Sequence, residues 1–187
     1  RVHPRHLDEM TVLVLGLGGI GKAVASRLKA FGSEVWGTSR SGRAVENVDR
    51  IVPRADLHDA LSRVDAVVVT LPGTDETRHM LDRQAFSSMK KGMILTNVGR
   101  GSVIDEAALL DALDDGTVDF AALDVVEREP LPHEHPLWDH EKVLLSPHSA
   151  ALSAQEGMRI AAIVARNATA LLDGTPLTNV VDTLNFY

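Results

Sequence analysis

Three side chains in the second half of the sequence have types that can do chemistry together. Arg100 stands in NVGRGSVIDE, Glu129 in ALDVVEREPLP and His148 in SPHSA. A guanidinium holds a carboxylate or a carbonyl through its fork of donors, and an imidazole gives or takes a proton near neutral pH. Each residue alone also has a structural interpretation: a surface arginine, a solvated glutamate in an acidic stretch, a packed histidine. Together we take them as candidate catalytic residues for hydride transfer beside a dinucleotide.

A glycine-rich turn near the N-terminus supplies the expected dinucleotide site. The stretch 11–28 reads TVLVLGLGGIGKAVASRL, an apolar run that enters glycines and continues with helical spacing. This order predicts a central strand at 11–15, a tight turn and a helix whose N-terminus faces phosphates. The first glycine makes the turn, the second lets a pyrophosphate approach, and the third lets the helix pack on the strand. The expected contacts are Gly16, Gly18, Gly19, Ile20 and Gly21.

The remaining elements alternate between strand and helix patterns. Further strands are expected at 34–38, 50–52, 65–71, 93–97, 120–126 and 143–146. Helices are expected at 57–61, at 106–113 with Asp105 as N-cap and Gly116 after it, and at 153–172. This alternation predicts an α/β fold of the Rossmann type, a doubly wound parallel sheet. We expect a dinucleotide-binding domain at 1–150 and a C-terminal helix and tail at 151–187.

Ligands of such sheets bind outside the carboxyl ends of the strands. The residues that follow each expected strand are therefore further candidates for contact with the cofactor. Besides the glycine turn, they are Ser39, Arg40, Ser41, Leu71, Pro72, Thr77, Val98, Gly99, Arg100, Asp124, His148 and Ala150.

Five blocks of the sequence resemble the D-isomer-specific 2-hydroxyacid dehydrogenases, in family order and spacing. They are GLGGIG, LPGTDETRHML, MKKGMILTNVGRGSVIDEAAL, DVVEREPLPHEHPLW and SPHSA. The resemblance implies that Arg100 binds a small 2-oxo acid such as glyoxylate or hydroxypyruvate. His148 would protonate its carbonyl as hydride arrives, giving the D-2-hydroxy acid, and Glu129 would hydrogen-bond the imidazole. Asp124 would line the nicotinamide end, and a homodimer is implied.

The resemblance also bears on the choice of cofactor. It places Ser39 where NAD-specific members carry an acid that binds the ribose 2′-OH, and Arg40 follows. A hydroxyl and a guanidinium suit a 2′-phosphate, which a carboxylate would repel. We therefore expect NADP(H) rather than NAD(H). The alternative is that Arg40 stacks on the adenine.

Two other functions fit the same residues. The family contains a transcriptional corepressor that senses dinucleotide without turnover, and a related dehydrogenase acts on phosphite. Formate dehydrogenases, which are similar, carry glutamine where this chain has Glu129, so Glu129-Pro130 favours a hydroxy acid.

Composition and charge limit the classes of protein to which the chain can belong. The net charge is −7, there is no cysteine, and no apolar run reaches the ~20 residues of a membrane span. We expect a cytoplasmic protein that binds neither nucleic acid nor membrane. His133, Glu134 and His135 lie between prolines and are expected to face solvent rather than bind a metal.

The chain differs from the family pattern at its start. Only ten residues precede the first expected strand, whereas family members place most of a substrate domain there. We expect a fragment that binds NADP(H) but turns over slowly or not at all alone. Its helix at 153–172 should then expose apolar surface.

Overall fold

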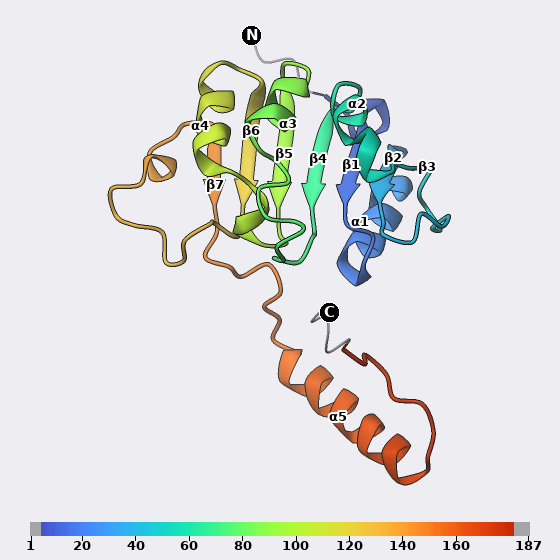
Figure 1. The fold of residues 1–187 in the computed structure, drawn as a ribbon. Helices are drawn as coiled ribbons and strands as arrows, with labels where there is room; N and C mark the ends of the chain where they lie inside the picture. The colour runs from blue at the N-terminus through green and yellow to red at the C-terminus, as the bar shows by residue number, and fades with distance from the viewer. Residues whose placement is uncertain (1–4, 182–187) are drawn as a thin grey trace. The chain divides into compact units, whose positions relative to one another are not determined.

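The computed structural model describes residues 5–181, and it contains a parallel sheet of seven strands (Figure 1). The strand order is β3-β2-β1-β4-β5-β6-β7. The strands are β1 (Thr11–Leu15), β2 (Glu34–Thr38), β3 (Arg50–Ile51), β4 (Ala66–Val69), β5 (Met93–Asn97), β6 (Val118–Leu123) and β7 (Val143–Leu145). The chain reverses its direction across the sheet between β3 and β4. The switch point, where such sheets bind ligands, therefore lies between β1 and β4.

Helices pack on both faces of the sheet. They are α1 (Gly19–Ala30), α2 (Leu57–Leu61), α3 (Arg83–Ser88) and α4 (Glu106–Asp114). Ala25 of α1 packs with Val14 and Val35 on one face. The helices α2, α3 and α4 share a larger apolar core with Leu13 and Leu95 on the other. The predicted α/β fold with a doubly wound parallel sheet is thereby confirmed.

Several predicted boundaries were wrong by a few residues. The strand predicted at 65–71 is the shorter β4, after which the Thr70 hydroxyl donates to the carbonyl of Gly16 (2.6 Å). The strand predicted at 120–126 begins at Val118 and ends at Leu123, where the chain enters a loop. Helix α3 was missed, although Asp82 caps it by accepting a hydrogen bond from the Ala85 N–H. Asp105 does cap α4, by accepting the Ala108 N–H.

Residues 149–187 form a second compact unit, separate from residues 1–148. Its helix is α5 (Glu156–Leu172). It begins three residues later than predicted, because the Ser153 hydroxyl and carbonyl accept the N–H groups of Gln155 and Glu156 in a preceding turn. The expected apolar exposure is confirmed: Met158, Val164 and Leu172 are 79%, 61% and 86% exposed.

Neither this helix nor any other between residues 5 and 181 is long and apolar enough to cross a membrane.

Candidate active site

The glycine turn between β1 and α1 is closed at its ends and open in its middle. Gly16 has φ +102°, and its N–H donates to the Thr38 hydroxyl (3.1 Å). A Cβ at Gly21 would lie 1.9 Å from the Gly16 carbonyl oxygen, so only glycine lets α1 start here. A Cβ at Gly18 or Gly19 would meet nothing within 4 Å. The open space at the N-terminus of a twelve-residue helix fits a bound pyrophosphate. Ile20, in the first turn of α1, is exposed.

The residues after β2 lie beside this turn in the sheet, because β2 pairs with β1. The hydroxyls of Ser39 and Ser41 are 3.5 Å apart, and the Ser41 hydroxyl accepts the N–H of Arg43 (3.3 Å). Arg40 is exposed. The loop therefore presents hydroxyls and guanidinium groups, and residues 39–43 contain no carboxylate.

The loop after β4 packs against the glycine turn. A Cβ at Gly16 would lie 2.9 Å from the Leu71 side chain. Thr77 is 8% exposed, donates its hydroxyl hydrogen to the Pro72 carbonyl (2.7 Å) and accepts the Thr74 N–H (2.9 Å). These contacts assign the Thr77 hydroxyl to shaping the loop that carries Leu71 and Pro72.

The loop after β5 holds Arg100 close to the loop after β4. A Cβ at Gly99 would lie 2.6 Å from the Leu71 carbonyl oxygen, which makes glycine necessary. Buried Asn97 accepts the Gly99 N–H and donates to the Arg100 carbonyl, both at 3.0 Å. The Arg100 guanidinium donates to the Gly99 carbonyl (2.7 Å) and is exposed. Sequence reasoning included Val98 and Gly99 but missed Asn97, whose signal is an amide at the end of an apolar strand.

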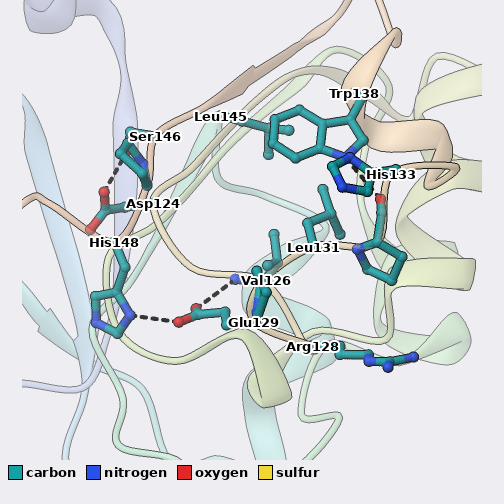
Figure 2. A pocket seen from close by; sticks show the side chains of 13 residues that line it. Asp124, Val126, Arg128, Glu129, Leu131, His133, Trp138, Leu145, Ser146 and His148 are labelled. Atoms are coloured by element: carbon teal, nitrogen blue, oxygen red, sulfur yellow. Dashed lines mark hydrogen bonds and ion pairs between the residues drawn. The ribbon is translucent and has the colours of Figure 1, made fainter.

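His148 and Glu129 form a hydrogen-bonded pair (Figure 2). The His148 Nδ1 lies 2.7 Å from Glu129 Oε2, and the other carboxylate oxygen accepts the Val126 N–H (3.2 Å). Because a carboxylate only accepts, the ring donates through Nδ1. His148 has φ +52°, and its N–H donates to the carbonyls of Asp124 and Ser146. The structure thus brings together residues that lie 19 positions apart.

A cavity of about 880 Å³ lies beside this pair. Figure 2 shows Glu129 and His148 among its lining residues, together with apolar Leu131 and Trp138. Asp124 is 7% exposed at its edge and accepts the Ser146 hydroxyl (2.5 Å). The cavity is large enough for a small organic ligand.

The loops that carry Arg100 and Glu129 touch directly. A Cβ at Gly101 would lie 1.9 Å from the carbonyl carbon and oxygen of Val126. Arg100, Glu129 and His148 therefore follow β5, β6 and β7, three neighbours at one edge of the sheet. Ala150, a further cofactor candidate, belongs to the unit at 149–187.

The prediction that residues 133–135 all face solvent was wrong for His135. Its side chain is 22% exposed, and its Nε2 lies 3.4 Å from Glu106 Oε2. His133 and Glu134 are exposed as expected. Across residues 5–181, no group of three or more His, Asp or Glu side chains is arranged to hold a metal ion.

Comparison with known proteins places the chain in a family. Residues 1–150 match the family described as D-isomer specific 2-hydroxyacid dehydrogenase, NAD binding domain. The chain is 40% identical over 173 residues to glyoxylate/hydroxypyruvate reductase B of Serratia proteamaculans, covering 92% of this chain and 53% of that protein. It is 39% identical over 172 residues to glyoxylate reductase of Aeropyrum pernix, covering 92% of this chain and 51% of that protein. The chain thus spans about half the length of these curated relatives.

Solved structures give the same result. A D-isomer specific 2-hydroxyacid dehydrogenase from Xanthobacter autotrophicus, in complex with NADPH and MES, superposes with a TM-score of 0.90 at 39% identity, covering 100% of this chain and 76% of that one. An NADPH-dependent glyoxylate/hydroxypyruvate reductase from Sinorhizobium meliloti, in complex with NADP and sulfate, has a TM-score of 0.90 at 35% identity, covering 100% and 60%. The chain therefore belongs to the D-isomer specific 2-hydroxyacid dehydrogenase family, as its five sequence blocks indicated, and residues 1–150 correspond to the NAD-binding domain of that family.

Proposed function

We propose that this chain is the nucleotide-binding and proton-donating part of an NADPH-dependent reductase that converts a small 2-oxo acid to its D-2-hydroxy acid. The observation that carries the proposal is the 2.7 Å contact between His148 and Glu129 at the edge of the sheet that also holds the open glycine turn. Relatives named glyoxylate reductase and glyoxylate/hydroxypyruvate reductase support this substrate class.

Each of the three residues has its own role in this reaction. A bound nicotinamide dinucleotide would supply the hydride to the carbonyl carbon of the substrate. Arg100 holds the carboxylate or the carbonyl of the 2-oxo acid with its guanidinium. His148 donates the proton from Nε2 to the carbonyl oxygen, and Glu129 stabilises the protonated ring and fixes its orientation through Nδ1. In the reverse direction the neutral ring takes the proton back.

Turnover tests these roles. Reduction of glyoxylate and of hydroxypyruvate is followed through NADPH consumption by the natural protein that contains this chain. His148→Ala should lower kcat/KM by about 10³-fold because it removes the proton donor. Glu129→Gln should lower it by about tenfold or more because it removes the charge that stabilises the protonated ring. NADPH binding should persist in both variants. His58→Ala in α2 is the control, and equal activity of His148→Ala and the parent would overturn the proposal.

The preference for NADP(H) belongs to the same proposal. It rests on Ser39, Arg40 and Ser41 after β2 and on the NADPH and NADP bound in similar structures. Arg40→Ala should weaken NADPH binding by about tenfold or more and leave NADH binding within about twofold. Equal losses for both nucleotides would show that Arg40 stacks on the adenine instead. A parent protein that binds NADH more tightly than NADPH would contradict the preference.

A further inference from the structure

The loop between β6 and β7 that carries Glu129 is fastened by charged residues outside the site. Glu106 begins α4, and its side chain is only 12% exposed. Its Oε1 accepts the N–H of Glu127 (2.5 Å), two positions before Glu129. Its Oε2 lies 3.4 Å from Nε2 of His135, on the other side of Glu129 in the sequence. One carboxylate therefore contacts this loop on both sides of Glu129.

The geometry of His135 fits a donor to Glu106. The Nδ1 of His135 accepts the N–H of Leu137 (3.3 Å). Because a neutral imidazole carries its single proton on the other nitrogen, the ring presents an N–H toward Glu106. Burial raises the pKa of the Glu106 carboxyl, and the hydrogen bond from the Glu127 N–H opposes this shift. A largely buried carboxylate with two partners is a costly feature that suits an ordering role.

A second anchor holds the same segment through the side chain of Glu127. Its Oε1 accepts hydrogen bonds from Arg78 (2.9 Å) and lies 2.7 Å from the His79 Nε2. The N–H of His79 in turn donates to the Ser102 carbonyl, in the loop that follows Arg100. The neighbouring N–H, that of Val126, donates to Glu129 itself. Successive N–H groups at 126 and 127 are thus fixed by Glu129 and Glu106.

We propose that Glu106 is a positioning residue that ties positions 127 and 135 of this loop together and so holds the Glu129 carboxylate against Nδ1 of His148. The proposal rests on the acid–base roles proposed above. It predicts that replacing Glu106 weakens the hydrogen bonds that join Val126, Glu129 and His148, although these three residues themselves are not substituted.

The test combines two variants with a spectroscopic readout in this chain. Glu106→Ala removes the acceptor, whereas Glu106→Gln keeps an oxygen that can accept the Glu127 N–H. In Glu106→Ala, amide hydrogen exchange at Val126 and Glu127 should accelerate by about tenfold or more, and the NMR signal of the His148 Nδ1–H should weaken or vanish through faster exchange. Glu106→Gln should restore both to within about threefold of the parent. Glu134→Ala, at an exposed position of the same loop, is the control.

Turnover of the natural protein gives the second readout. Glu106→Ala should lower kcat for the 2-oxo acid by about tenfold and leave the Kd for NADPH within about twofold. Unchanged exchange at Val126 and Glu127, or an unchanged His148 signal, in a folded Glu106→Ala protein would overturn the positioning role. If Glu106→Ala fails to fold, Glu106→Asp, whose shorter side chain withdraws the carboxylate from the Glu127 N–H, should accelerate exchange at Val126 and Glu127, and parent-like exchange in Glu106→Asp would equally overturn the positioning role. These signals do not depend on catalysis, so they remain informative even if His148→Ala leaves turnover intact.

Discussion

The two halves of the sheet edge that we assign to function are built in different ways. Between β1 and α1 the site consists of backbone: a glycine turn, open space at Gly18 and the N-terminus of α1. Around β5, β6 and β7 it consists of side chains, Arg100, Glu129 and His148, held by loops that contact one another. A backbone site depends on the absence of side chains at the glycines of one short stretch of sequence. A side-chain site depends on several distant stretches that must agree in position.

The largest effect is expected where the backbone half is most tightly closed. Gly21→Ala places a methyl group 1.9 Å from the Gly16 carbonyl oxygen, with backbone rather than a flexible side chain in the way. The free energy of unfolding should fall by at least about 3 kcal/mol, because the strand and α1 must separate. Denaturant unfolding measures this loss.

Gly18→Ala tests the open middle of the same glycine turn. Gly18 has φ −76° and ψ −160°, which alanine adopts freely, and an added Cβ meets no protein atom within 4 Å. Stability should stay within about 0.5 kcal/mol of the parent, while NADPH affinity falls by about tenfold or more because the methyl occupies the space proposed for the pyrophosphate. Unchanged affinity would mean that the nucleotide does not approach this turn.

A substitution at Gly101 should disrupt the side-chain half of the site. Gly101→Ala forces the Arg100 loop away from Val126, since its Cβ would lie 1.9 Å from the Val126 carbonyl group. We expect a loss of about 1–3 kcal/mol in stability and of about tenfold or more in kcat/KM, because the reacting groups lose alignment. The Kd for NADPH should change by less than about threefold. Gly157→Ala in α5, where nothing lies within 4 Å, is the matched control.

The same contrast explains what the sequence could predict. The order of elements and the glycine turn follow from local patterns, an apolar run followed by Gly16, Gly18 and Gly21, and the strands β1, β2 and β5 were predicted at their observed bounds. Arg100, Glu129 and His148 could be selected because each follows a predicted strand. Helix α3 was missed because its six residues hold too few apolar positions for a helical period.

The contacts that support the side-chain half could not be predicted from the sequence. Glu106 reads as an ordinary acidic residue in the first turn of a helix, where it would favour the dipole. Its contact with the Glu127 N–H joins positions 21 apart, and the contact of Arg78 with Glu127 joins positions 49 apart. No local spacing encodes such pairs, since they exist only once β5 and β6 are adjacent. His135 was assigned to solvent for the same reason.

The smallest effect is expected at Asp49, which supports the backbone half from the side. Its carboxylate accepts the N–H of Val35 in β2 (2.7 Å) and pairs with Lys29 of α1 (3.0 Å). The hydrogen bond from Val35 is the main reason that the pKa of Asp49 lies below its usual value, with Lys29 acting in the same direction against the opposing effect of burial. Asp49→Ala should therefore cost about 1 kcal/mol of stability at pH 7, discounted for the partial exposure of the pair.

The pH dependence of this loss separates the carboxylate from the side chain that bears it. Because the pKa is lower in the folded state than the ordinary value of 3.8, the stabilisation is complete above that value and disappears as the pH falls through the folded-state pKa. The stabilities of the parent and of Asp49→Ala should thus begin to converge as the pH falls below 3.8, whereas Asp75→Ala in an exposed loop should show no such convergence. A difference between parent and Asp49→Ala that does not change as the pH falls below 3.8 would assign the effect to packing. Since the Asp49 carboxylate bonds to β2 and α1, at the other half of the sheet edge, the hydrogen bond between His148 and Glu129 should be the same in the variant and the parent.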